Sequence, residues 1–186
     1  MFETSYRVTA LTRIKKPGTK PHVLHERLFK FKTEQGGVYL ILVEVYEFDV
    51  AVLKFYRQRD ENYKNKFNTV LEDSEHQSIR VVSKILRTVV NVALWVYKKD
   101  NYTSFAFQGA PKLKGGVKED LVLTQRFRIY DYITNQLFGS RSFEHRKAKG
   151  SSYYMMVSKL NSDYVIHGNK IERAFAEWFE ELDFLQ

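Results

Sequence analysis

Two arginines in one short segment, Arg126 and Arg128, are the residues of this chain best suited to bind an anion. They follow Thr124, which stands where a helix is predicted to begin. The backbone N–H groups at a helix N-terminus attract anions, and a guanidinium group can hold a phosphate through two hydrogen bonds. We therefore expect an anion pocket here. The alternative is that one arginine pairs with a carboxylate, because residues two apart point in nearly opposite directions from a helix.

Three further segments, residues 15–20, 112–118 and 145–150, are short, basic and glycine-containing, and we predict them to be loops. Basic loops around an aromatic-rich body suit a polyanion such as nucleic acid. We expect the three loops to lie near one another, away from the acidic C-terminal helix. Together with the two arginines they define the predicted nucleic-acid-binding residues: Lys15, Lys16, Lys20, Lys112, Lys114, Lys118, Arg126, Arg128, Arg146, Lys147 and Lys149.

Another set of polar residues falls at helical spacing on one face of a helix predicted over residues 75–99. This stripe could follow a phosphate backbone, and its tryptophan could stack on a base, a contact worth about 1–3 kcal/mol. The alternative is a solvated helix face whose tryptophan covers a neighbouring strand. The members of the stripe are Arg80, Lys84, Arg87, Asn91, Trp95 and Lys98.

Catalytic and metal-binding patterns are weaker. The set Arg141, His145, Arg146 and Tyr153 offers the proton acceptor, proton donor and cations that a metal-independent ribonuclease needs. A lone loop histidine is, however, more often plain polar surface. A pair of histidines at 22 and 25 would point to opposite faces of a strand, so we predict no metal site there. The chain has no cysteine, Walker loop, dinucleotide fingerprint or nucleophile elbow, and we predict no cofactor.

The elements that must position these groups predict an α+β fold, in one domain over residues 1–186. Alternating apolar residues and turn signals indicate an antiparallel meander of about four strands up to residue 57, with Val38–Tyr46 as a central strand. We predict a second helix beginning between Glu119 and Thr124 and ending at Gly139, and a last helix over residues 170–185. The expected architecture is a mostly antiparallel sheet of about six or seven strands, with two long helices on one face and a C-terminal helix closing an edge.

Composition agrees with a folded, basic protein. The chain has 186 residues, of which 44% are hydrophobic and 15% aromatic, enough for a sizeable core. Its net charge of +8 is uneven, because residues 161–186 carry −4 and the remainder +12. The N-terminus lacks the pattern of a signal peptide, and no apolar run is long enough to cross a bilayer. We therefore expect a cytoplasmic protein with no membrane partner.

Two short motifs carry a family resemblance. They are the run Ser83–Val89, which contains Leu86-Arg87-Thr88-Val89, and the run from Thr124 to Tyr130 that follows Gly109. Their order resembles that of small uncharacterised domains of unknown function common in Bacteroidetes. In those domains a strand, a helix with a Leu-x-Thr-Val run, a Gly-containing strand end and an Arg-x-Arg-Leu-Tyr-like helix follow one another. The resemblance loosely spans residues 26–157, and it implies the order of elements but no activity.

The sequence thus favours binding over catalysis. The leading hypothesis is a non-catalytic nucleic-acid-binding protein that uses backbone phosphates and ring stacking, with little sequence specificity. One alternative is a protein-interaction module, such as an inhibitor or adaptor in a phage–host or toxin–antitoxin setting of bacteria. The other is the small metal-independent ribonuclease. The expected partner is accordingly nucleic acid or another protein.

Overall fold

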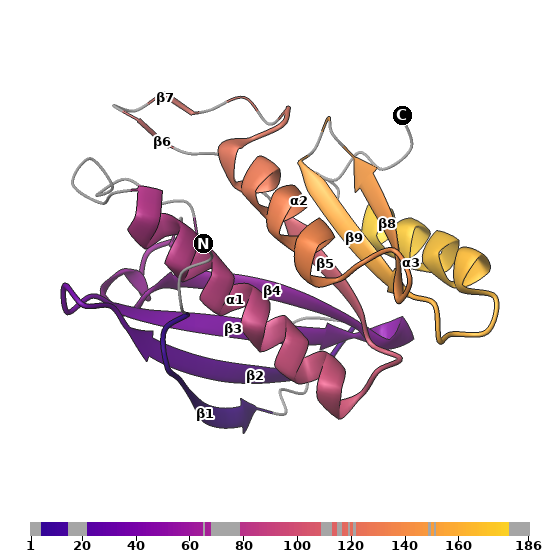
Figure 1. Cartoon of the computed structure of the whole chain (residues 1–186), viewed down its shortest axis with the longest axis horizontal. Helices are drawn as coiled ribbons and strands as arrows, with labels where there is room; N and C mark the ends of the chain where they lie inside the picture. The colour runs from indigo at the N-terminus through magenta and orange to yellow at the C-terminus, as the bar shows by residue number, and fades with distance from the viewer. Residues whose placement is uncertain are drawn as a thin grey trace.

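A seven-stranded β-sheet with helices on both faces forms the frame of the protein, as the computed structural model shows (Figure 1). The structure describes residues 5–14, 22–64, 66–67, 79–108, 113–114, 117–118, 120, 122–148, 150 and 152–178. The sheet contains β1 (Val8–Ile14), β2 (Val23–Lys32), β3 (Val38–Tyr46), β4 (Val50–Arg57), β5 (Ser104–Gln108), β8 (Phe143–Ala148) and β9 (Tyr153–Ser158). The helices are α1 (Ile79–Lys99), α2 (Gln125–Leu137) and α3 (Tyr164–Trp178), with short 3-10 turns η1 (Glu47–Asp49) and η2 (Gln58–Asp60).

The strands lie in the order β1-β2-β3-β4-β5-β9-β8. All neighbours are antiparallel except β4 and β5, which are parallel. Parallel strands need a long crossover connection, and α1 lies within it. The prediction of a mostly antiparallel α+β sheet with six or seven strands and two helices on one face is confirmed. A separate two-stranded hairpin, β6 (Leu113–Lys114) with β7 (Val117–Lys118), stands outside the sheet.

The turn between β2 and β3 depends on a glycine. The Gly36 N–H donates to the Thr33 carbonyl at 3.0 Å, and the Thr33 N–H donates to the Gly37 carbonyl at 2.9 Å. Gly36 has a φ of 85°, a left-handed conformation in which a Cβ atom would be strained. The turn fixes the register in which the central strand β3 pairs with β2.

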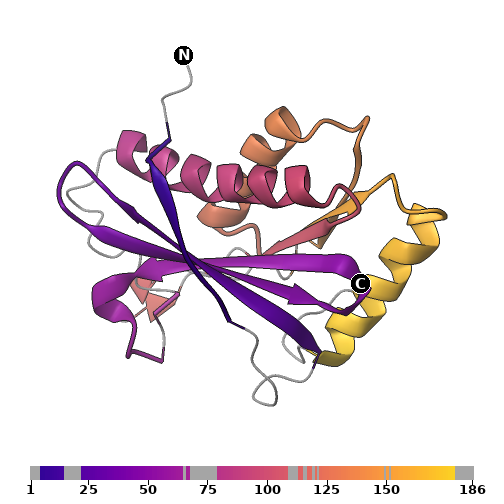
Figure 2. The same cartoon turned by 90° about the horizontal axis from the view of Figure 1, so that it is seen from below.

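The two faces of the sheet bury different sets of side chains. On one face α1 and α2 pack side by side (Figure 2), and Ile85, Leu86 and Val89 of α1 are fully buried against the sheet. On the other face α3 buries Ile171 and Phe175 in a second hydrophobic cluster. Strand β9 divides its residues between these clusters: Tyr154 and Met156 belong to the first, and Tyr153, Met155 and Val157 to the second.

The C-terminal helix departs from its prediction. It begins at Tyr164 rather than near residue 170, and it covers a face of the sheet instead of closing an edge. The segment before residue 170 resembles a loop because it is rich in Asn, Asp and Gly, yet Gly168 lies buried inside the helix. Helix α2 also differs slightly, since it ends at Leu137 with Phe138 as its C-cap, before Gly139.

Among the described residues, no helix is both long enough and apolar enough to span a bilayer.

Candidate nucleic-acid interface

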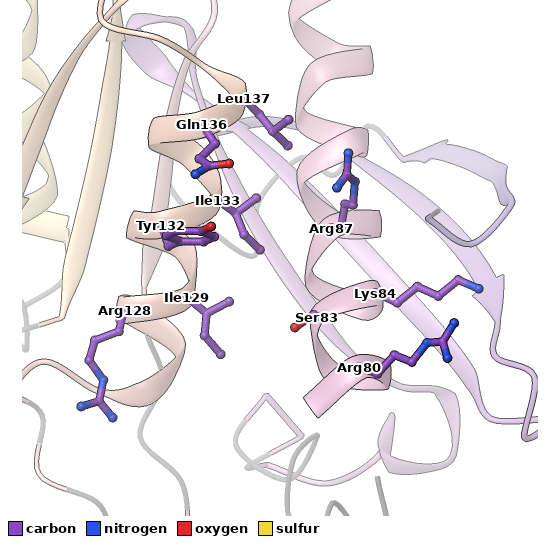
Figure 3. Close-up of a pocket in the computed structure, with 10 residues that line it drawn as sticks. All are labelled: Arg80, Ser83, Lys84, Arg87, Arg128, Ile129, Tyr132, Ile133, Gln136 and Leu137. Carbon is purple, nitrogen blue, oxygen red and sulfur yellow. The ribbon is translucent and has the colours of Figure 1, made fainter. Parts of the chain in front are cut away.

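A groove of about 530 Å³ runs between α1 and α2, and its walls bring together two stripes of side chains that are distant in the sequence (Figure 3). Both helices lie on the same face of the sheet, so one flank of each is left facing the other. The residues that line the groove are Arg80, Ser83, Lys84 and Arg87 from α1, and Arg128, Ile129, Tyr132, Ile133, Gln136 and Leu137 from α2.

Helix α2 owes its position to an N-cap and a buried flank. The Thr124 hydroxyl accepts a hydrogen bond from the Phe127 N–H at 3.2 Å, which satisfies one of the free donors at the helix start. Phe127, Tyr130 and Thr134 are buried against the sheet. The flank that remains carries two adjacent stripes at a spacing of four residues, Arg128–Tyr132–Gln136 and Ile129–Ile133–Leu137.

The two stripes of α2 have different roles in the groove. Ile129, Ile133 and Leu137 are partly buried and pack against the main core, so they form an apolar floor that points toward α1. The side chain of Tyr132 stands beside them and is 58% exposed. Arg128 is exposed near the start of α2, and its side chain points away from α1 (Figure 3). No residue among those described forms an ion pair with Arg128.

Helix α1 supplies the opposite rim. Its buried residues fall on the sheet side, which leaves Arg80, Lys84 and Arg87 on the flank that borders the groove. These cations project outward from α1, whereas the Ser83 side chain points across the groove toward α2 (Figure 3). The groove therefore has an apolar floor and positively charged margins, and Arg80, Lys84, Arg87 and Arg128 are the four cations among its lining residues.

The carboxylate of Glu34 partly neutralises the positive charge of the α1 rim. Glu34, in the β2–β3 turn, pairs with the Lys84 ammonium group and accepts a hydrogen bond from the Tyr6 hydroxyl at 2.7 Å. The Lys84 and Tyr6 hydrogen bonds lower the pKa of Glu34 to about 2. Glu34 is therefore ionised at neutral pH. The Lys84 ammonium also lies 4.4 Å from the centre of the Tyr6 ring, which holds it in place.

The predicted tryptophan platform is largely occupied. Trp95 is 40% exposed, but its ring meets Phe29 edge-on at 5.5 Å. The Arg27 guanidinium and the Lys99 ammonium lie 5.7 Å and 5.8 Å from its ring centre. These contacts fit the alternative reading, in which the residue covers a strand. The exposed aromatic residue among the groove's lining residues is Tyr132, which was not predicted, although its spacing of four from Arg128 and Gln136 is visible in the sequence.

The structure brings one of the eleven predicted binding residues, Arg128, into the groove. Arg126 lies in the first turn of α2, and Lys114 and Lys118 lie in the two strands of the β6–β7 hairpin. The predictions for the other loop lysines fall outside the described residues, and so does the predicted convergence of the first two loops. These lysines are Lys15, Lys16, Lys20, Lys112 and Lys149.

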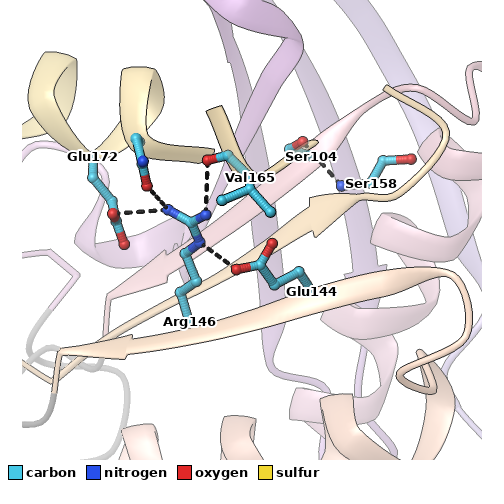
Figure 4. A network of polar contacts seen from close by, with 7 residues as sticks. Ser104, Glu144, Arg146, Ser158, Val165 and Glu172 are labelled. Carbon is cyan, nitrogen blue, oxygen red and sulfur yellow. Dashed lines mark hydrogen bonds and ion pairs between the residues drawn. The ribbon is translucent and has the colours of Figure 1, made fainter. Parts of the chain in front are cut away.

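The third predicted loop is wrong, because residues 143–148 form strand β8. Arg146 points toward α3 and is held by four hydrogen bonds (Figure 4). Its guanidinium donates to Glu144 Oε1 at 2.9 Å, Glu172 Oε2 at 2.9 Å, Asn169 Oδ1 at 2.8 Å and the Val165 carbonyl at 2.9 Å. A Cβ atom on Gly168 would stand only 2.5 Å from the Arg146 Cζ. Arg146 is therefore a structural cation that joins β8 to α3.

Lys147 occupies the other face of β8. Its ammonium pairs with Asp131 of α2 at 2.6 Å and lies 5.6 Å from the centre of the Tyr154 ring. Neighbouring strand residues point to opposite faces, so Arg146 and Lys147 serve different helices. Both are tied to carboxylates, and neither lies among the residues that line the groove.

The candidate ribonuclease set is divided in the same way. His145 lies on the α2 side, where its Nε2 contacts the Phe138 carbonyl at 3.0 Å and its Nδ1 contacts the Tyr154 hydroxyl. Burial lowers the pKa of His145, which favours a neutral ring that donates through Nε2 and accepts through Nδ1. Arg146 and Tyr153 lie on the α3 side. The set forms no common site, and both nitrogens of its histidine have structural partners.

The other histidines that the sequence singled out also lie in structural surroundings. The His22 ring stacks on Trp178 of α3 at 4.5 Å, and its Nδ1 lies 3.5 Å from Glu47 Oε1. Within the described part of the chain, no three His, Cys, Asp or Glu residues are grouped so that they could hold a metal ion.

Comparisons with protein-family models, with curated proteins and with solved structures found no match.

Proposed function

We propose that this protein binds single-stranded nucleic acid in the groove between α1 and α2. The observation that supports this most directly is the combination of an apolar floor and an exposed tyrosine with cations on both rims. Arg80 and Arg87 border one side, and Arg128 borders the other. A nucleic acid strand offers the matching pattern, since its bases are flat and largely apolar while its phosphates are anionic.

The rim cations would bind the backbone. Arginine holds phosphate through paired N–H donors, and its contacts with the backbone do not depend on sequence. Each phosphate that is neutralised releases counterions, so affinity for a single strand falls with salt at a slope of about −0.7 per contact. The net charge of +8 adds long-range attraction for a polyanion.

The floor and the tyrosine would bind bases. A ring stacked on a base contributes about 1–3 kcal/mol, and apolar side chains such as Ile129 and Ile133 exclude water from the other surfaces of the base. In a duplex the bases are paired and stacked on one another, so their faces are not accessible to Tyr132. The groove therefore favours a single strand over a duplex.

Fluorescence anisotropy with a labelled single-stranded oligonucleotide of mixed sequence, as DNA and as RNA, tests the proposal. We expect Arg80→Ala with Arg128→Ala to weaken binding and to make the salt slope shallower by about 1.4, since each lost contact removes about 0.7. Tyr132→Ala should weaken binding about 5- to 150-fold, with an unchanged salt slope. The matched control is Arg173→Ala, because Arg173 is exposed on α3, on the opposite face of the sheet.

Absence of binding, or an equal loss in the Arg173→Ala control, would overturn the proposal. The apolar floor also allows the protein-interaction alternative, in which an acidic amphipathic segment of a partner occupies the groove. Tight, salt-insensitive binding of an acidic amphipathic peptide, together with no binding of oligonucleotides, would show that the ligand of the groove is a protein segment and not nucleic acid.

A further inference from the structure

The groove contains two polar groups whose roles are not explained by phosphate binding or stacking. Gln136 is exposed at the end of the Arg128–Tyr132–Gln136 stripe, one helical turn beyond Tyr132. Ser83 lies on α1, and its side chain points across the groove toward α2 (Figure 3). The Gln136 carboxamide has no hydrogen-bond partner among the described residues. Both groups thus border the space in which a base stacked on Tyr132 would lie.

We infer that the groove recognises an unpaired adenine base within a single strand, with Gln136 and Ser83 reading its edges. This inference rests on the proposed function and adds a base preference to it. A glutamine carboxamide can donate to adenine N7 and accept from the adenine N6 amino group at the same time. The rise of about 1.5 Å per residue places Gln136 about 6 Å along the helix from Tyr132, within reach of the edge of a base that stacks on the tyrosine ring.

Ser83 faces the base from the opposite wall. Its hydroxyl group can donate to a ring nitrogen and rotate to suit it. The apolar floor between the two polar residues strengthens this interpretation, because it keeps water away from their hydrogen bonds. A base that left one of these polar groups unpaired would then bind more weakly than adenine. A ligand pocket of small-molecule size has a volume of about 300–1,000 Å³, and the groove falls within that range.

The test compares the affinities of labelled homopolymers, oligo(A), oligo(C) and oligo(U), for the whole protein. We expect oligo(A) to bind about tenfold more tightly than the other two, in line with the discrimination of a bidentate amide contact. Gln136→Ala should remove that ratio. Gln136→Glu should shift preference toward oligo(C), because a carboxylate accepts from the cytosine amino group. Ser83→Ala should reduce the ratio by a smaller factor.

The matched control is Asn135→Ala. Asn135 is the adjacent amide on α2, but it bonds to Asp131 of its own helix and does not line the groove. It should leave the oligo(A) preference unchanged. Circular dichroism of each variant checks the fold, and the ratio between homopolymers is unaffected by a uniform loss of affinity.

The outcomes separate this inference from the proposed function. Equal binding of all three homopolymers, with no change in Gln136→Ala, would overturn adenine recognition and leave single-strand binding intact. Failure of every oligonucleotide to bind would overturn both. Adenosine monophosphate that competes as well as oligo(A) at equal nucleotide concentration would show that the site takes a free nucleotide, and would overturn the single-strand assignment.

Discussion

Arg146 beneath α3 and Arg128 beside the groove lie on opposite faces of the same sheet. They differ in exposure and in the number of polar groups that contact them. The Arg146 side chain is 13% exposed and bonds to two carboxylates, an amide and a carbonyl group. Arg128 is exposed at the end of an apolar groove. The first arrangement fixes two elements to each other, whereas the second leaves a cation for a ligand. An arginine becomes a candidate ligand-binding residue only when its contacts in the fold are known.

The largest expected difference between the two arginines is in their contribution to stability, which replacing each of them by methionine tests. Arg146→Met leaves Glu144 and Glu172 without their cation, and it should destabilise the protein by about 2–3 kcal/mol, near the lower end for a broken buried pair because both carboxylates are partly hydrated. Arg128→Met should change stability by less than about 0.5 kcal/mol. Chemical denaturation measures both. Similar losses in the two variants would contradict the division into structural and exposed arginines.

A smaller effect is expected from Gly168→Ala. The added Cβ would stand 2.5 Å from the Arg146 Cζ, so the guanidinium must shift away from its partners. Overpacking costs about 1–3 kcal/mol, and the better helix propensity of alanine offsets about 1 kcal/mol of it. We expect a net loss of about 1 kcal/mol. The same change in an Arg146→Met background should be neutral or stabilising, which a double-mutant cycle measures. A loss that is equal in both backgrounds would mean that the close contact is not the cause.

The stability of the protein should depend on pH through His145, on the α2 side of the sheet. Burial lowers the pKa of His145 below its ordinary value of 6.5, so the unfolded chain binds more protons than the folded protein between those two pKa values. Stability should therefore rise with pH through this window and be lost as the pH falls below about 6.5. Denaturation of His145→Gln at pH 5–8 should show a flatter profile. His167, whose pKa burial also lowers, should supply the remaining slope. An unchanged pH profile of stability in His145→Gln would show that His145 does not contribute to this pH dependence.

The smallest effect concerns Glu34. Its pKa of about 2 lies far below the working range, so its protonation should not alter oligonucleotide affinity between pH 5.5 and 8. Glu34→Gln removes the carboxylate paired with Lys84, and affinity should rise at low salt, by only about twofold because the charge is exposed and well hydrated. Glu177→Gln, an exposed change on α3, is the control. A weaker affinity in Glu34→Gln would show that the pair positions Lys84 for binding.

Local sequence signals predicted much of this fold. The alternation of β1–β4, the apolar stripe of α1 and the Thr124 N-cap are properties of neighbouring residues. Strand β3 has the predicted bounds, α1 ends at Lys99 as predicted while its predicted start lies outside the described residues, and Thr124 caps α2. The start of α3 was missed because the segment before residue 170 is rich in Asn, Asp and Gly, and the close contact of Gly168 with Arg146, more than twenty residues away, is not visible in the sequence. The identity of the exposed cations was missed for the same reason, since ion pairs between β8 and α3 depend on tertiary contacts.

The single parallel junction between β4 and β5 has a consequence for the order of folding. Strands β2, β3 and β4 are joined by short connections, so we expect their local contacts to form quickly, whereas β5 pairs with β9 across about fifty residues of chain. One wall of the groove, α1, precedes this junction, and the other, α2, follows it. We therefore expect the groove to form late in folding, and oligonucleotide binding during refolding should report when the two halves of the chain have joined.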